Sequence, residues 1–227
     1  MYHRDFAEQP LTGKYAAVLR RLTPRSTVLE VGCHTGYFTR ALAAAGHDVV
    51  GMEADAEAAA EAIAGGSNVI IGDIENTDSL ARLQGQFDFI LLMDVLEHLR
   101  DPATTLCRLR PLLREHSRVL ITGPNVAFFF LRWSLLLGRW DYQETGILDH
   151  THLHFYTKAS WRRMVEDNGY RVVDIESVEG MLPFQTRLSR LLRRADLVEW
   201  ARLQAIKRGS ELCTMVYLIE AQPTWIE

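Results

Sequence analysis

Residues 27–40, TVLEVGCHTGYFTR, decide the fold that we expect for this chain of 227 residues. The aliphatic run at 28–31 predicts a buried strand, Gly32 and Gly36 predict a turn, and a helix is expected from about Tyr37. A strand, a glycine turn and a helix place backbone N–H groups at the carboxyl edge of a parallel sheet, where open α/β sheets bind their ligands. The stretch therefore predicts a ligand site at this edge.

Glu30 indicates which ligand this edge suits. The dinucleotide fingerprint needs three glycines, but Gly32 is followed by His34 and Tyr37 where the second and third would fall. A carboxylate two residues before the first glycine attracts a cationic ligand more than a diphosphate across a short, partly dry gap. S-adenosylmethionine carries a sulfonium and an ammonium and no phosphate, so it matches this edge better than a dinucleotide does.

The composition is that of an ordinary globular protein, with 48% hydrophobic and 24% charged residues. A formal charge of -4 gives no global electrostatic reason to bind nucleic acid. Cys33, Cys107 and Cys213 form no Cys-x-x-Cys pair, which predicts neither a disulfide framework nor a thiolate metal site. The N-terminus has no apolar signal segment, and the longest apolar run, residues 126–138, is interrupted by Arg132 and too short to span a bilayer. We therefore expect a cytoplasmic protein.

Strands and helices alternate along the chain, as in a parallel sheet with crossover helices. The apolar patterns predict strands at residues 28–31, 48–52, 68–72, 87–93, 118–122, 171–178 and 212–221, and helices at 11–22, 37–45, 55–64 and 158–168. We expect one domain, residues 1–227. The alternation breaks at residues 125–157 and 181–210, which are expected to be inserted segments that form a cap or lid.

The glycine turn carries a family resemblance. Residues 30–36, Glu-Val-Gly-Cys-His-Thr-Gly, resemble motif I of the class I S-adenosylmethionine-dependent methyltransferases, although His34 stands where the family often has its middle glycine. The resemblance spans about residues 27–170 and is to small-molecule and glycan-associated members, similar to methyltransferase type 11 and 23 domains. It implies an α/β fold with a Rossmann-like, seven-stranded mixed sheet, mostly parallel with an antiparallel last strand, and helices on both faces. It also implies S-adenosylmethionine as cofactor and S-adenosylhomocysteine as product.

The cofactor site is expected along the carboxyl edge of the sheet. Glu53, at the end of the second strand and about twenty residues beyond the glycine turn, is placed to accept hydrogen bonds from both ribose hydroxyls. Its alternative role is to cap the next helix, which Asp55 could do equally well. The resemblance implies an adenine contact after the third strand, methionine contacts after the fourth, and a histidine facing cofactor or acceptor. The expected cofactor-binding residues are Glu30, Gly32, Cys33, His34, Gly36, Tyr37, Glu53, Ala54, Asp73, Ile74, Met93, Asp94 and His98.

Asp94, Glu97 and His98 also resemble the acid-x-x-Glu-His set of the quinone-biosynthesis O-methyltransferases, for which a divalent metal has been implicated. Oxygen and imidazole ligands suit Mg²⁺ or Zn²⁺. Glu97 suits equally well the start of a helix, where the helix dipole favours a carboxylate. We therefore assign no metal-binding residues from the sequence and keep a divalent metal as the less favoured alternative.

Three alternating histidines, His150, His152 and His154, are the candidate catalytic residues. In an extended segment all three would face one side. A hydroxyl acceptor benefits from a base whose pKa lies near the working pH, and histidine is the first choice. Residues 149–153 resemble the pattern Asp-x-Thr-His-Leu of this family, and its Thr-His-Leu favours His152, then His150, then His154. The alternatives are a structural role in a solvated loop and an amine or thiol acceptor that needs no base.

A missing motif restricts the class of acceptor. No Asn-Pro-Pro-Tyr or Asp-Pro-Pro-Tyr, the signature of amino-directed nucleic-acid methyltransferases, follows the fourth strand, so a nucleobase acceptor is not expected. We expect an enzyme that methylates a hydroxyl or acid oxygen of a small molecule, natural product or glycan, acting in natural-product or polysaccharide biosynthesis as a monomer or homodimer. N-methylation is the alternative within the class.

The arginine-rich, partly apolar segment at residues 183–209 suits a helix packed on the sheet, a lid, or a peripheral contact with anionic lipid. A non-catalytic domain of the same fold, binding a partner or a membrane through this segment, is the alternative outside the enzyme class.

Overall fold

The computed structural model describes residues 11–183 and 195–225. Its seven strands form one sheet in the order β3-β2-β1-β4-β5-β7-β6. Strands β1 to β5 pair in parallel, whereas β7 is antiparallel to both of its neighbours, β5 and β6. The expected seven-stranded, mostly parallel sheet with an antiparallel last strand is confirmed. The strands are β1 (Thr27–Val31), β2 (Asp48–Glu53), β3 (Val69–Ile71), β4 (Phe87–Met93), β5 (Leu113–Pro124), β6 (Tyr170–Gly180) and β7 (Thr214–Pro223).

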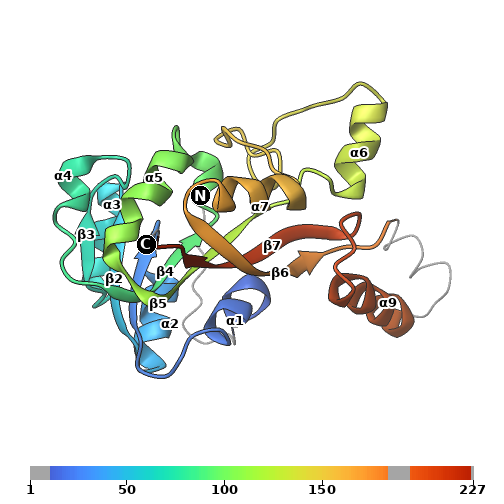
Figure 1. Cartoon of the computed structure of the whole chain (residues 1–227). Coiled ribbons are helices and arrows are strands. Elements are labelled where there is room, and N and C mark those ends of the chain that lie inside the picture. Colours follow the sequence, from blue (N-terminus) through green and yellow to red (C-terminus); the bar gives the residue numbers. More distant parts are fainter. Residues whose placement is uncertain (1–10, 184–194, 226–227) are drawn as a thin grey trace.

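Helices cover both faces of the sheet (Figure 1). Helices α4, α5 and α6 are not among those expected from the sequence, and the expected entry helix at 11–22 is shorter in the structure. The expected helical excursion at 183–207 includes α9, while residues 184–194 lie outside the described part of the chain. The α-helices are α1 (Gly13–Leu19), α2 (Tyr37–Ala44), α3 (Ala56–Ala64), α4 (Thr77–Leu80), α5 (Pro102–Leu109), α6 (Phe129–Leu136), α7 (Lys158–Glu166) and α9 (Ala195–Lys207), with 3-10 turns η1 (Leu96–His98) and η2 (Arg110–Leu112).

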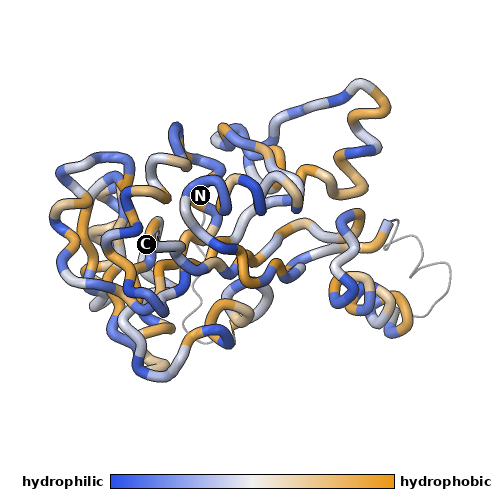
Figure 2. Tube along the Cα trace, viewed as in Figure 1, coloured by the Kyte–Doolittle hydropathy of each residue, from blue (hydrophilic) through white to orange (hydrophobic). Residues whose placement is uncertain are grey.

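Two apolar cores lie on the two faces of the sheet. Side chains alternate along β1, so Val28 packs with α1 and α2 on one face, while Leu29 belongs to the core of the other face with α5 and α7. Trp161 of α7 is fully buried in that second core. Because the central strands are buried on both faces, they appear in the sequence as continuous apolar runs. Figure 2 shows these runs as hydrophobic stretches through the middle of the molecule.

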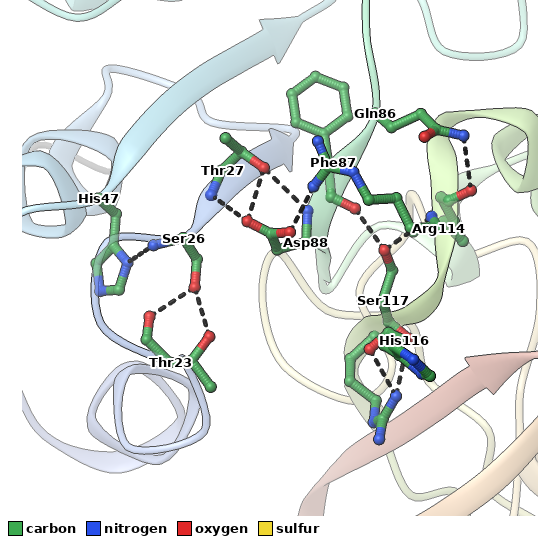
Figure 3. A network of polar contacts seen from close by, with 12 residues as sticks. Thr23, Ser26, Thr27, His47, Gln86, Phe87, Asp88, Arg114, His116 and Ser117 are labelled. Atoms are coloured by element: carbon green, nitrogen blue, oxygen red, sulfur yellow. Dashed lines mark hydrogen bonds and ion pairs between the residues drawn. The ribbon is translucent and has the colours of Figure 1, made fainter.

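A polar network ties the strands together at their amino ends (Figure 3). The carboxylate of Asp88 on β4 accepts hydrogen bonds from the backbone N–H (2.8 Å) and hydroxyl (2.9 Å) of Thr27 on β1, and pairs with Arg114 on β5 (2.5 Å). The hydroxyl of Ser117 donates to the carbonyl oxygen of Phe87 at 2.7 Å. These contacts lie at the edge opposite the glycine turn. None of them involves the carboxyl edge, where the ligand site is expected.

None of the helices that the structure describes is both long enough and apolar enough to cross a bilayer.

Candidate active site

The glycine turn after β1 has a left-handed backbone at three places, with φ of 70° at Gly32, 49° at His34 and 73° at Gly36. A Cβ on Gly36 would lie only 2.7 Å from the hydroxyl of Ser67, so a side chain is excluded there by space as well as by conformation. His34 keeps the conformation that a glycine adopts without strain, at a cost of roughly 1 kcal/mol. The turn therefore holds its shape despite the departure at this position.

Glu30 lies almost fully buried at the end of β1 and faces a cavity of about 410 Å³. The hydroxyl of Thr39 donates to its carboxylate at 2.6 Å. Burial raises the pKa of Glu30 to about 7, an effect that the Thr39 hydrogen bond opposes and the nearby Glu53 carboxylate reinforces. A cation in this cavity would favour the ionised carboxylate. The same cavity is also lined by other expected residues, namely Gly32, Cys33, His34, Tyr37 and Met93.

Glu53 supports the glycine turn from the end of β2. Its carboxylate accepts hydrogen bonds from the backbone N–H of His34 at 2.7 Å and of Asp55 at 2.9 Å. Asp55 caps α3, because its side chain accepts from the backbone N–H of Glu57 and of Ala58. The capping role considered for Glu53 thus belongs to Asp55, and Glu53 lies against the turn.

The residues expected at the adenine end follow β2 and β3 at the same edge. The backbone N–H of Gly72 donates to the carbonyl oxygen of Glu53 at 2.8 Å, which holds the start of the next loop beside β2. The side chain of Asp73 accepts from the backbone N–H of Glu75 at 2.8 Å and closes a turn, while Ile74 is buried. The lining of the glycine-turn cavity includes none of Glu53, Ala54, Asp73 and Ile74, and of these four Glu53 is hydrogen-bonded to the turn.

Asp94 follows β4 with a left-handed φ of 54°. One carboxylate oxygen accepts a hydrogen bond from the hydroxyl of Thr122 at 2.7 Å, and the other pairs with the ammonium of Lys14 on α1. Burial by itself would lower the pKa of Lys14, but the attraction and hydrogen bond of Asp94 outweigh it and raise that pKa. Lys14 and Asp94 therefore form a charged pair at the point where the sequence places the methionine half of the cofactor.

A second cavity, of about 680 Å³, adjoins the first. Lys14, His34 and Met93 line both cavities, so the two share a boundary. The second cavity is also lined by Asp94, by the η1 turn, by residues 144–152 of the inserted segment, and by Pro124 of β5 and Met215 and Val216 of β7. The arrangement gives a cofactor-sized cleft at the glycine turn with a larger space next to it.

Hydrogen bonds to Nδ1 determine the tautomers of two histidines in the second cavity, His98 and His152. The hydroxyl of Thr151 donates to Asp149 at 2.7 Å and lies 2.9 Å from Nδ1 of His98, so it must accept a hydrogen bond from that nitrogen. Nδ1 of His152 lies 3.0 Å from the carbonyl oxygen of Ile147, which can only accept. In each ring Nε2 is then the unprotonated nitrogen, free of hydrogen bonds to any residue that the structure describes, and the ring centres are 4.6 Å apart. Burial and the neighbouring imidazole of His152 lower the pKa of His98, which favours its neutral form.

Glu97 lies between these histidines and is fully buried. Neither carboxylate oxygen has a hydrogen-bond partner among the residues that the structure describes, and burial raises the pKa of Glu97 well above the ordinary value. One ligand atom from each of Glu97, His98 and His152 lies within 4.8 Å of the others, and no other such group of metal-ligating side chains is found in the described residues. An orphaned carboxylate beside two imidazoles whose second nitrogens are already bonded fits a divalent cation. The set differs from the resembled one, because His152 takes part and Asp94 is bound to Lys14 and Thr122.

The three alternating histidines do not lie in one extended segment, and of the three only His150 and His152 line the second cavity. The backbone N–H of Asp149 donates to Gly146 and that of His152 donates to Asp149, so the chain turns instead of running extended. His150 lies exposed at the rim of the second cavity, whereas His152 is buried in its wall. The ring of His154 stacks on Tyr156, with centres 6.0 Å apart, outside the lining of that cavity.

Comparison with known proteins gives the family. A family model described as a methyltransferase domain matches residues 3–175. The chain belongs to the S-adenosylmethionine-dependent methyltransferases. A structure of such a methyltransferase from Archaeoglobus fulgidus has a TM-score of 0.65 at 18% identity and covers 92% of this chain and 91% of its own. The magnesium protoporphyrin IX methyltransferase of Synechocystis, with bound S-adenosylhomocysteine, has a TM-score of 0.58 at 17% identity and covers 92% of this chain and 80% of its own.

Curated relatives of this methyltransferase carry a more specific name. The ubiquinone biosynthesis O-methyltransferase of Aromatoleum aromaticum is 30% identical over 152 residues, which are 65% of each chain, so the match spans just under two thirds of that relative. The protein of the same name from Aeromonas salmonicida is 26% identical over 184 residues, or 77% of this chain and 76% of that protein.

The cleft of the methyltransferase fits its cofactor. S-adenosylmethionine is cationic at its sulfonium, and Glu30 and Asp94 face the two adjoining cavities at the ends of β1 and β4. The bare backbone at Gly32 and Gly36 lets a ligand approach the turn closely. The ribose, adenine and catalytic roles of the individual residues stay predictions.

Sequence reasoning missed two residues of the site. Lys14 comes from α1, 80 positions away from its partner Asp94, and no local motif marks it. Thr151, which bonds both His98 and Asp149, lies within the quoted Asp-x-Thr-His-Leu pattern. The signal for Thr151 was therefore present, although only the histidines were selected from it.

Proposed function

We propose that this methyltransferase transfers a methyl group to the hydroxyl oxygen of a small-molecule acceptor, with a natural product or a glycan as the expected class. One observation carries the proposal: His98 and His152, each with a free Nε2, line a cavity that adjoins the cofactor cleft. A hydroxyl, unlike a thioether or a thiolate, needs its proton removed during methyl transfer. The names of the O-methyltransferase relatives support oxygen as the acceptor atom.

Alignment is the main task of the protein in this reaction. When bound, S-adenosylmethionine supplies an activated methyl group on a positively charged sulfur. Glu30 and Asp94 hold that charge at the carboxyl edge, and Met93 forms part of the boundary between the two cavities. Holding donor and acceptor in line removes much of the entropic barrier of a reaction between two molecules.

Proton removal falls to the histidine pair in this proposal. Nε2 of His152, the base favoured by the sequence, or of His98 accepts the acceptor's proton. The carboxylate of Asp149 bonds Thr151, and Thr151 bonds Nδ1 of His98, so a positive charge that forms on His98 is stabilised through the hydroxyl. His150 at the rim is the second candidate from the sequence, and His154 lies outside this cavity lining.

A divalent cation is the alternative use of the same cluster. Glu97, His98 and His152 would hold it, and it would lower the pKa of a bound hydroxyl as a Lewis acid. Either use leaves the acceptor oxygen beside these three residues.

The charge of the acceptor can also be inferred. The carboxylates of Asp94, Glu144, Asp149 and Glu179 line the second cavity, and Lys14, the one lysine or arginine that the described residues contribute to its lining, is bound to Asp94. Such a lining repels phosphorylated or carboxylated acceptors and favours neutral ones. It suits an amine as well, which makes N-methylation the second candidate function.

The test is turnover of labelled S-adenosylmethionine with a panel of catechols, neutral sugars, amines and carboxylic acids, followed by identification of the methylated atom. We expect O-methylated product from a neutral hydroxyl acceptor, and a loss of turnover in His152→Ala that the matched variant His116→Ala, at the opposite edge of the sheet, does not share. Methyl transfer only to nitrogen would reject the proposal. Tight cofactor binding without turnover on any acceptor would favour the non-catalytic alternative.

A further inference from the structure

Helix α6 exposes an apolar surface that the proposed reaction does not use. Leu136 is 79% exposed and Trp133 60%, and their large apolar neighbours are also exposed. We define the α6 surface as Phe130, Trp133, Leu135, Leu136, Leu137 and the adjacent Leu212. Figure 1 shows α6 projecting from the edge of the molecule, and Figure 2 shows that it is largely hydrophobic.

The orientation of this surface is fixed by contacts on the other side of α6. Leu131 and Phe128 are buried, and the backbone N–H of Phe129 donates to the carbonyl oxygen of Leu212 at 2.9 Å. The guanidinium of Arg132 donates to the carbonyl oxygen of Ala127 at 2.6 Å. The helix is therefore held with these apolar side chains outward, and an exposed cluster of large apolar side chains on one short helix is typical of an interaction site.

The charges around the α6 surface select its occupant. Residues 126–140 contain Arg132 and Arg139 and no acidic residue, although the whole chain has a formal charge of -4. Arg132 lies 3.8 Å from Glu211, while Arg139 forms no ion pair with any residue that the structure describes. A tryptophan among aliphatic side chains, flanked by arginines, matches the boundary between the headgroups and acyl chains of an anionic bilayer.

A second copy of this chain fits the α6 surface less well. In a two-fold contact the same patch lies on both partners, so both copies of Arg139 would lie in one interface, and residues 126–140 supply no acid to balance them. Lipid phosphates supply that balancing charge.

We propose that the α6 surface docks this methyltransferase on an anionic lipid bilayer, with the aliphatic side chains and Trp133 inserted at the interface and Arg139 among the headgroups. The contact is peripheral, because α6 has 8 residues and cannot span a bilayer. The segment that carries α6 continues into residues 144–152, which line the second cavity. Docking therefore involves the same inserted segment as the acceptor site, whichever acceptor is methylated.

The experiment is co-sedimentation of the full chain with vesicles of phosphatidylcholine alone or mixed with phosphatidylglycerol. We expect binding to the mixed vesicles that weakens with added salt, and little binding to phosphatidylcholine alone. The double variant Trp133→Ser, Leu136→Ser should lower the affinity at least about tenfold, and Arg139→Glu roughly fivefold. The matched control is Trp200→Ser on α9, because Trp200 is 59% exposed and lies outside the α6 surface.

The result can overturn the proposal in three ways. Absence of binding to anionic vesicles at low salt rejects it, as does binding that is lost in Trp200→Ser but kept in the α6 variants. A dimer that the α6 substitutions disperse, with no vesicle binding by the unaltered chain, assigns the surface to a second copy instead. Unchanged calorimetric affinity for S-adenosylhomocysteine verifies that each variant is folded, and this readout is independent of the acceptor.

Discussion

The ammonium of Lys14 pairs with the carboxylate of Asp94, joining α1 to the loop after β4 across the boundary of the two cavities. Thr122 on β5 donates to the other oxygen of the same carboxylate. Only 18% of the Lys14 side chain and 30% of the Asp94 side chain are exposed, so water screens the pair little. The pair fixes the entry helix against the cofactor cleft.

The Lys14–Asp94 pair predicts a strong coupling in a double-mutant cycle. Asp94→Asn removes the carboxylate that is hydrogen-bonded to the ammonium of Lys14, and we expect it to lower the free energy of unfolding by about 1 to 3 kcal/mol. Lys14→Met combined with Asp94→Asn should recover part of that loss, with a coupling energy of at least about 1 kcal/mol. Urea unfolding of the two single variants and the double variant measures it. Strictly additive effects would mean that the pair contributes nothing.

Glu53 is predicted to bind the cofactor as well as to support the glycine turn. Glu53→Ala should weaken S-adenosylmethionine binding by roughly 1.5 to 3 kcal/mol, because charge-assisted hydrogen bonds to the ribose hydroxyls are lost. Isothermal titration calorimetry measures the change. The control is Glu57→Ala, an exposed residue on α3 beyond the cap. Equal affinities in the two variants would remove Glu53 from the ribose role.

Glu30 predicts a pH dependence of stability. Its pKa of about 7 lies above the ordinary 4.5, so the folded state binds this proton more tightly than the unfolded chain does. The free energy of unfolding therefore falls as pH rises from 4.5 to about 7 and is level above it. Glu97, whose pKa is also raised, acts in the same direction.

Glu30→Gln tests this dependence, because the amide oxygen can still accept the Thr39 hydroxyl. The stability difference between about pH 5 and about pH 8 should shrink by roughly 2 to 3 kcal/mol, measured by urea unfolding. Glu61→Gln, an exposed change on α3, should leave the difference as it was. An unchanged difference in Glu30→Gln would show that Glu30 titrates normally in the fold.

The sequence predicted the strands of the sheet better than the helices around the site. Residues 87–93 match β4 because a strand buried on both faces is a continuous apolar run. Helix α5 was missed although Asp101 and Pro102 signal its start and its buried positions, Pro102, Thr105, Leu106 and Leu109, fall at helical spacing, so its signal was present in the sequence. The glycine turn and its acids could be placed because each follows a strand end. Lys14 could not be placed from the sequence, because its position depends on how α1 packs. The three alternating histidines could not be placed either, because the chain turns at Asp149.

The buried cluster of Glu97, His98 and His152 predicts a response to divalent cations. Mn²⁺ or Zn²⁺ should raise the midpoint of thermal unfolding, because a ligand that binds only the folded state stabilises it. Glu97→Gln should abolish the shift while preserving the fold, since a buried carboxyl with a raised pKa is already close to a neutral amide in charge and shape. Chelator-treated protein is the reference. A shift of the same size in Glu97→Gln would assign the cation to another site.

Substitution of His152 is expected to affect turnover without affecting cofactor binding. His152→Ala should lower turnover on the order of a hundredfold, whether the ring accepts the proton or holds a cation, and should leave S-adenosylhomocysteine affinity unchanged. The ring is buried against Ile147 and His98 on the acceptor side, and it is not part of the glycine-turn cavity. Steady-state kinetics and calorimetry on the same preparation measure the two quantities. Addition of imidazole should restore part of the turnover if His152 is the base, and added metal should do so if the ring is a ligand. Turnover that survives the substitution would transfer the base role to His98, whose Nε2 is equally free.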